Sequence, residues 1–193
     1  MLNLNEFAQE VHAVAVEHGW WEGEENNDID TKIALIHAEW SEALEEYRAG
    51  RPMVWHRCDD PAAEGLVICE SCPYCCYQGG ECKDRNPKPE GIAVELVDGC
   101  IRIMDLMAAK EMDFAQAGYI CGGERTLPQL VAILHYATAK SAESESEAAS
   151  WLISCIEAVR EWLEERDVDM DEVLRLKHKY NKTRSYRHGG KRC

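Results

Sequence analysis

The sequence predicts an all-α fold with a helical-bundle core. Apolar side chains recur every three to four residues in segments 31–48 and 91–109, which is the spacing of amphipathic helices. Five of the six prolines lie in residues 52–89, so helix-breaking residues are concentrated in one stretch. With 193 residues the chain can bury a substantial core, and we expect a single domain over residues 1–193.

The first helix is expected over about residues 5–18. Apolar residues recur at helical spacing from Phe7 to Val14, and Gly19 follows as a helix-ending residue. Trp20 and Trp21 come next and are expected in a loop before the second helix.

The second helix is expected over residues 31–48 and carries an acidic stripe. Its core-facing residues are Ile33, Ile36, Trp40, Ala43, Leu44 and Tyr47. Glu39, Glu42 and Glu46 fall together on the adjoining stripe. Carboxylates three or four residues apart on a helix repel one another unless water or a cation screens them. The stripe is therefore either a solvated acidic face or one half of a cation site.

The third helix, expected over residues 91–109, has an acidic line on an otherwise apolar surface. Glu95, Asp98, Arg102 and Asp105 share one stripe, and apolar residues fill most of the remaining circumference. A helix this apolar is expected to be buried on more than half of its surface, so the acidic line faces a cleft or a partner helix.

Packing of the second helix against the third would bring four carboxylates together. They belong to Glu39, Glu42, Glu95 and Asp98. Like charges in a partly desolvated site are costly unless divalent cations neutralise them. Ligation by oxygen alone suits Mg²⁺ or Mn²⁺, which also bind phosphates.

Four blocks in this sequence resemble the MazG-like all-α nucleoside triphosphate pyrophosphohydrolases. They are Gly19-Trp20-Trp21, the E-x-x-E of Glu39 to Glu42, the E-x-x-D of Glu95 to Asp98, and KHKYNKTRSYRHGGKR at residues 177–192. The resemblance covers residues 1–50, 88–117 and 166–192. It implies a four-helix-bundle-type core whose four carboxylates hold Mg²⁺ or Mn²⁺.

The resemblance also implies a reaction, the cleavage of an NTP or dNTP to the monophosphate and pyrophosphate by a metal-activated water. Either Glu39 or Glu42 is expected to accept the proton of that water. Lys177, Asn181 and Arg184 match the substrate-contacting positions of the family, and their i, i+4, i+7 spacing predicts one helix face.

Other positions near the site leave alternatives open. Asp105, two turns beyond Asp98, is expected to hold the metal shell or the sugar. Trp20 and Trp21 either pack over the end of the bundle or stack on a nucleobase. Two other readings remain open. One is a catalytically silent nucleotide- or protein-binding member of the fold, and the other is phosphoribosyl-ATP pyrophosphohydrolase, which would not need the inserted segment.

The segment at about residues 52–89 is an insertion relative to the family pattern, and it is rich in cysteine. It contains Cys58, Cys69, Cys72, Cys75, Cys76 and Cys82. The C-x-x-C-x-x-C-C-x5-C spacing is typical of a metal-binding knuckle, because nothing else in the sequence suggests secretion. A structural Zn²⁺ held by Cys69, Cys72, Cys75 or Cys76, and Cys82 is one interpretation. A surface loop of reduced cysteines and an iron–sulfur cluster are the others.

Residues 126–192 are interpreted as a degenerate repeat of residues 1–117, followed by the basic C-terminal substrate segment. The segment 130–142 echoes residues 33–37 and their continuation, and residues 151–169 echo 95–113 at a constant offset. At the acidic positions the second copy carries Ala137, Lys140, Trp151 and Ser154. The chain is therefore expected to form an internally duplicated pseudo-dimer, either as a monomer or as a homodimer, with residues 141–150 connecting two helices.

The charge balance restricts the partners. A net charge of −15 opposes a broad grip on DNA or RNA, so the expected partner is a small anionic nucleotide received through metal ions and a few basic residues. The sequence has no apolar run of 18 residues and no basic N-terminal region. We therefore expect a cytoplasmic protein that does not bind a membrane.

Overall fold

The computed structural model describes residues 2–23, 28–58, 67–69, 87–119 and 123–187. Most of them are helical, which confirms the all-α prediction. The helices are α1 (Leu4–Glu17), α2 (Ile29–Arg48), α3 (Ile92–Ala109), α4 (Leu127–Ser141), α5 (Glu145–Glu164) and α6 (Met170–Asn181). Three short strands lie between α2 and α3: β1 (Trp55–Cys58), β2 (Val67–Cys69) and β3 (Lys88–Glu90).

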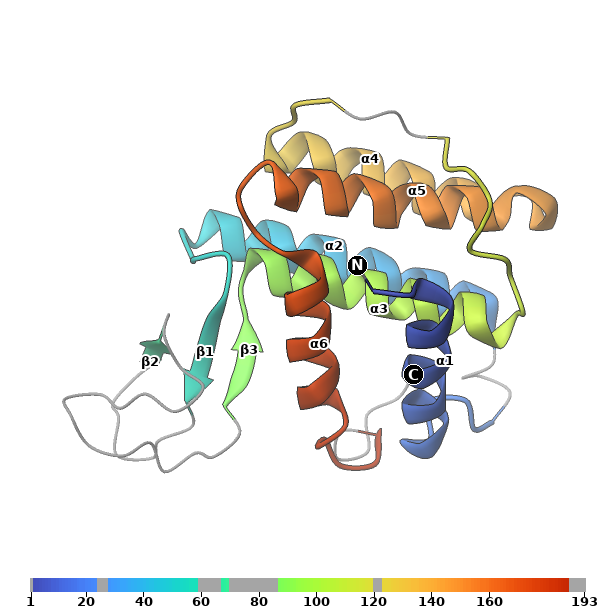
Figure 1. Ribbon diagram of the computed structural model, residues 1–193, viewed down its shortest axis with the longest axis horizontal. Coiled ribbons are helices and arrows are strands. Elements are labelled where there is room, and N and C mark those ends of the chain that lie inside the picture. The colour runs from blue at the N-terminus through green and yellow to red at the C-terminus, as the bar shows by residue number, and fades with distance from the viewer. Residues whose placement is uncertain (1, 24–27, 59–66, 70–86, 120–122, 188–193) are drawn as a thin grey trace.

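The helices are arranged in layers around α3. Figure 1 shows α2 and α3 side by side, with α4 and α5 along one side of this pair and α1 and α6 crossing it on the other. The layers pack directly, because α2 contacts α3 and α4, and α3 also contacts α1, α5 and α6. Fourteen of the residues of α3 are buried, so this helix is the centre of the hydrophobic core.

Local capping interactions fix the starts of several helices. The side chain of Asn3 accepts a hydrogen bond from the Glu6 N–H at the start of α1. Asp28 and Asp169 do the same at the starts of α2 and α6, where they accept from backbone N–H groups of the first turn. At α4, the Gln129 side chain accepts from the Thr126 N–H.

A glycine lets α2 approach α3 closely. A Cβ at Gly99 would lie 2.2 Å from the ring of Trp40, so only a residue without a side chain fits beneath this indole. Trp40 itself is fully buried, and its Nε1–H donates to Thr138 Oγ1 of α4 at 3.0 Å. The indole therefore joins three helices.

The contact between α2 and α4 pairs residues that the proposed repeat makes equivalent. His37 and His135 stack with ring centroids 5.0 Å apart, and their Nδ1 atoms are 2.7 Å apart. Trp40 and Thr138 are separated by the same 98 positions as the two histidines. Contacts between equivalent positions are what a pairing of two repeats about a local two-fold axis would produce.

Gly118 and Tyr119, between α3 and α4, lie against α5. The Tyr119 N–H donates to Ser154 Oγ at 2.6 Å, and the Tyr119 ring lies against Trp151 with centroids 4.7 Å apart. A Cβ at Gly118 would lie 2.2 Å from Glu157 Oε2, so this backbone sits directly on the helix. Positions 151 and 154, which correspond to Glu95 and Asp98 in the proposed repeat, therefore contact protein chain.

A small sheet, which the sequence analysis did not predict, stands at one end of the α2–α3 pair. Its strand order is β2-β1-β3 with antiparallel pairing, and β3 leads directly into α3. The buried Trp55 of β1 attaches the sheet to α2, because its Nε1–H donates to Glu46 Oε2 at 2.7 Å. Strands of three and four residues are too short to give a clear alternating pattern in the sequence.

Three expectations about local structure were wrong. Tyr47, placed in the core by periodicity, is 49% exposed because it lies in the last turn of α2, at the edge of the bundle. The connection between α4 and α5 is short, since α5 begins at Glu145. The C-terminal helix α6 ends at Asn181, so Arg184 does not continue its face.

Candidate active site

Three carboxylates from α2 and α3 meet in one cluster. One oxygen from each of Glu39, Glu42 and Glu95 lies within 4.8 Å of the others. Glu39 and Glu95 are almost fully buried, whereas Glu42 is exposed, so the cluster opens to solvent on the Glu42 side. Three of the four carboxylates that were predicted to converge meet in this cluster, and Asp98 is not one of them.

Two basic side chains neutralise part of this charge. Lys177 Nζ of α6 lies 3.1 Å from Asp98 Oδ2 and 3.9 Å from Glu95 Oε2, which joins Asp98 to the cluster. Arg102 Nε of α3 donates to Glu39 Oε1. Four carboxylates against one lysine and one arginine leave an excess of about two negative charges when all groups are ionised.

Burial and mutual repulsion make two of the carboxyls hard to ionise. Burial, followed by the nearby charge of Asp98, raises the pKa of Glu39 to about 7. Burial raises the pKa of Glu95 to about 9, even though Lys177 acts in the opposite direction. Burial also raises the pKa of Asp98, but attraction to Lys177 and Arg102 outweighs it and the net pKa lies below the usual value.

The donor set of this cluster fits a hard divalent cation. Every ligand atom is a carboxylate oxygen, and two ligands on opposite sides of Mg²⁺ lie about 4 Å apart, close to the spread of the cluster. An excess of two negative charges matches one Mg²⁺ or Mn²⁺. Glu39, Glu42 and Glu95 are thus the residues that would hold the ion, with waters completing its coordination, and Asp98 is joined to them through Lys177.

The raised pKa values of Glu39 and Glu95 predict how the stability of the metal-free protein depends on pH. In the unfolded chain Glu39 and Glu95 titrate near 4.5, whereas in the folded protein their pKa values are about 7 and 9. The folded state therefore binds more protons across this window, and the free energy of unfolding should fall as pH rises from 6 to 8.5. Urea denaturation in EDTA measures this fall, and saturating Mg²⁺ should reduce it.

A double variant supplies the control for this pH dependence. Replacing Glu39 and Glu95 with glutamine removes both titrations while keeping the side-chain shape. The free energy of unfolding of this variant should change much less between pH 6 and 8.5. A wild-type protein that gains stability over the same range in EDTA would contradict the assigned shifts.

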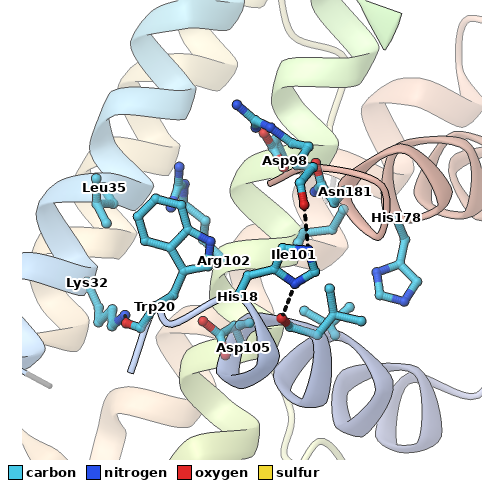
Figure 2. A pocket seen from close by; sticks show the side chains of 14 residues that line it. His18, Trp20, Lys32, Leu35, Asp98, Ile101, Arg102, Asp105, His178 and Asn181 are labelled. Carbon is cyan, nitrogen blue, oxygen red and sulfur yellow. Dashed lines mark hydrogen bonds between the residues drawn. The ribbon is translucent and has the colours of Figure 1, made fainter. Parts of the chain in front are cut away.

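A cavity lies beside the carboxylate cluster, between α1, α2, α3 and the end of α6 (Figure 2). Its apolar lining comes from Val11, Val14, Ala15, Trp20, Leu35 and Ile101. Its polar lining comes from His18, Lys32, Asp98, Arg102, Asp105, His178, Asn181 and Arg184. Asp98 and Arg102 are joined to the cluster and also line the cavity, so a ligand in the cavity would reach the cluster.

The residues predicted to contact substrate occupy different positions around this cavity. Asn181 and Arg184 line it, and Asn181 Oδ1 is buried without a hydrogen-bond partner among the described residues. Lys177 is 1% exposed and is engaged by Asp98 and Glu95, so its ammonium faces the carboxylates. A buried acceptor such as that of Asn181 costs free energy unless a ligand or water satisfies it.

Asp105 lines the cavity but already has two protein partners. It accepts from Trp21 Nε1 at 2.9 Å and lies 2.7 Å from His12 Nδ1. Trp21 also carries Lys32 over its ring, 4.1 Å from the centroid. Trp21 therefore packs over the end of the bundle, which was one of the two alternatives for the tryptophans. Trp20 lines the cavity.

Sequence reasoning missed three side chains at this site. Arg102 shares a stripe of α3 with Glu95 and Asp98. Because that stripe was expected to face the acidic stripe of α2, its position could have indicated the pairing with Glu39. Lys32 lies one helical turn before Ile36 in the core helix, yet it is buried, with Nζ donating to the Trp20 carbonyl at 2.7 Å. His18 contacts Arg184, a residue 166 positions away, and no local pattern indicates such a contact.

The predicted zinc knuckle lies mostly outside the described residues. Cys69 belongs to β2, and Cys72, Cys75, Cys76 and Cys82 fall in the segment that the structure does not describe. The zinc interpretation therefore stays a prediction.

Comparisons with family models, with curated proteins and with solved structures found no match to this chain. Among the described residues, no helix is both long enough and apolar enough to cross a membrane. The case for a function therefore rests on the residues and their geometry.

Proposed function

We propose that this chain is a Mg²⁺-dependent nucleoside triphosphate pyrophosphohydrolase of the MazG-like type, which cleaves an NTP or dNTP to the monophosphate and pyrophosphate. The observation that carries the proposal is the meeting of Glu39, Glu42 and Glu95 in one cluster beside a cavity. The cluster supplies oxygen ligands for cations, and the cavity supplies an apolar wall and polar groups for a nucleoside.

The cation and the carboxylates would have different roles in this reaction. Bound Mg²⁺ would supply a Lewis acid for the phosphates and lower the pKa of a coordinated water. Glu39 or Glu42 would accept the proton of the water at a carboxylate oxygen. The water would attack a phosphorus of the α–β anhydride and break its P–O bond to the bridging oxygen, which separates the nucleoside monophosphate from pyrophosphate.

The C-terminal residues would position the substrate. Arg184 lines the cavity, and its guanidinium makes no hydrogen bond or ion pair with any residue that the structure describes. It is thus available for a phosphate, to which guanidinium groups donate two parallel hydrogen bonds. The unpaired Asn181 Oδ1 would accept from a sugar hydroxyl or a water. Lys177 would hold Asp98 and Glu95 in place from behind.

We propose further that the chain is an internally duplicated pseudo-dimer with one site. The stacking of His37 on His135 and the bond from Trp40 to Thr138 support this arrangement, because both pairs join positions that are 98 residues apart. Gly118 and Tyr119 lie against α5 at positions 151 and 154, where the second repeat would carry the equivalents of Glu95 and Asp98. Residues 1–117 would then be catalytic and residues 126–192 would supply packing and substrate contacts.

A substrate panel tests the reaction. The protein would be incubated with each of the common NTPs and dNTPs plus Mg²⁺, and pyrophosphate and the monophosphate would be measured. We expect equal amounts of both products from at least one nucleotide and none in EDTA. Release of inorganic phosphate alone would overturn the proposal. No turnover of any nucleotide would also overturn it and would favour a silent binding protein with the same fold.

A further inference from the structure

Arg184, which lines the cavity, lies beyond the end of α6, so something other than the helix must fix its position. Helix α6 ends at Asn181, and the Arg184 N–H donates only to the Asn181 carbonyl in a turn. The guanidinium carbon of Arg184 lies 5.9 Å from the ring centroid of Tyr180. A single turn would leave such a segment free to move.

His18 supplies a contact that the turn lacks. Its Nε2 lies 2.8 Å from the Arg184 carbonyl oxygen, and its Nδ1 lies 2.8 Å from the Val14 carbonyl oxygen (Figure 2). Carbonyl oxygens only accept, so the imidazole satisfies both contacts when each ring nitrogen donates. The ring thus bridges α1 and the backbone of Arg184 directly at the cavity wall.

The residues after Arg184 continue this attachment. We call residues 184–187 the strap. The Arg187 N–H donates to the His18 carbonyl at 3.1 Å, and the Arg187 guanidinium donates to the Gly19 and Glu22 carbonyls at 3.2 and 2.9 Å. The Tyr186 hydroxyl donates to the Glu22 carboxylate.

Two features of the contact between the strap and the end of α1 require a glycine at position 19. Its φ of +79° is a conformation that L side chains rarely adopt, and it ends α1. A Cβ at this position would lie 2.4 Å from the Tyr186 ring. The turn after α1 is therefore shaped to receive the strap.

We propose that His18 is a positioning residue that holds the strap against the end of α1 and thereby sets Arg184 at the substrate cavity. The role rests on the proposed function, since Arg184 is taken to bind a phosphate of the nucleotide. His18 itself need not touch the substrate. It acts through the Arg184 backbone, and its loss should free the strap without disturbing the carboxylate cluster.

Limited proteolysis without nucleotide tests whether His18 holds the strap. In His18→Phe a ring of similar size remains but both hydrogen bonds are lost, so trypsin cleavage after Arg184 should be about tenfold faster than in the wild type. Arg187→Met, which removes contacts at the other end of the strap, should also make trypsin cleavage after Arg184 faster. Glu17→Gln, at an exposed neighbouring position of α1, should cleave at the wild-type rate. Equal rates for His18→Phe and wild type would overturn the proposal.

Kinetics then test whether the strap positions Arg184. His18→Phe and Arg184→Met should each raise KM for the nucleotide about tenfold with a smaller change in kcat, and the double variant should be no worse than Arg184→Met. His18→Gln, which restores one donor, should recover part of the loss. Additive effects of His18→Phe and Arg184→Met would overturn the positioning role. If the wild type turns over no nucleotide, the proposed function fails and Arg184 has no phosphate to bind, while proteolysis still decides whether His18 holds the strap.

Discussion

Replacing Glu42 with alanine is expected to lower Mg²⁺-dependent pyrophosphate release by at least about 100-fold. Glu42 is the exposed member of the carboxylate cluster, so its removal takes away a cation ligand without opening a hole in the core. The remaining Glu39 and Glu95 are already paired with Arg102 and Lys177. The excess negative charge that attracts the ion therefore falls by about half. Steady-state assays at several Mg²⁺ concentrations measure the effect.

Glu45 provides the matched control for this variant. It is an exposed glutamate on the same helix, three residues further along, and its partner is Arg48 rather than the cluster. Glu45→Ala has the same change in charge and helix propensity, so it should keep near-wild-type activity and stability. Full activity in Glu42→Ala, or an equal loss in Glu45→Ala, would remove Glu42 from the site.

Replacing Trp40 with alanine is expected to cost about 3–5 kcal/mol of unfolding free energy. The indole is fully buried between α2, α3 and α4, and its loss leaves a cavity above Gly99. It also leaves the buried Thr138 hydroxyl without the Trp40 donor. For a chain of this size the melting temperature should fall by about 10 °C or more, as measured by calorimetry in EDTA so that metal binding does not contribute.

Tyr47 is the control for the loss of an aromatic residue from α2. It lies two turns beyond Trp40 and is 49% exposed, so Tyr47→Ala should change the free energy of unfolding by no more than about 1 kcal/mol. Both variants remove an aromatic side chain from α2, so a difference between them reports the effect of burial. If both variants melt at the same temperature, the packing assigned to the α2–α4 contact is wrong.

The sequence was sufficient to find the helices that build the site, because periodicity is a local signal. Spacing alone placed Glu39 and Glu42 on one stripe and Glu95 and Asp98 on another, and α2 and α3 do pack with these stripes close together. Their burial follows from the apolar character of α3. The helix-ending Gly19 is an equally local signal.

Features that depend on tertiary crossing were not predictable in the same way. Lys177 was expected at a phosphate, but α6 crosses α3 so that its ammonium points at Asp98. Arg184 was expected on a helix face, yet its helix ends three residues earlier. The partner of His18 lies at the opposite end of the chain. In each case the decisive contact joins segments that no short sequence window contains.

A Mn²⁺ titration measures whether the carboxylate cluster binds divalent cations. Free Mn²⁺ would be followed by electron paramagnetic resonance as it is added to metal-free protein at pH 8. We expect saturable binding of at least one ion per chain, displaced by Mg²⁺ and strongly weakened in Glu42→Ala but not in Glu45→Ala. Wild-type protein that leaves all added Mn²⁺ free, or binding that persists unchanged in Glu42→Ala, would contradict the account.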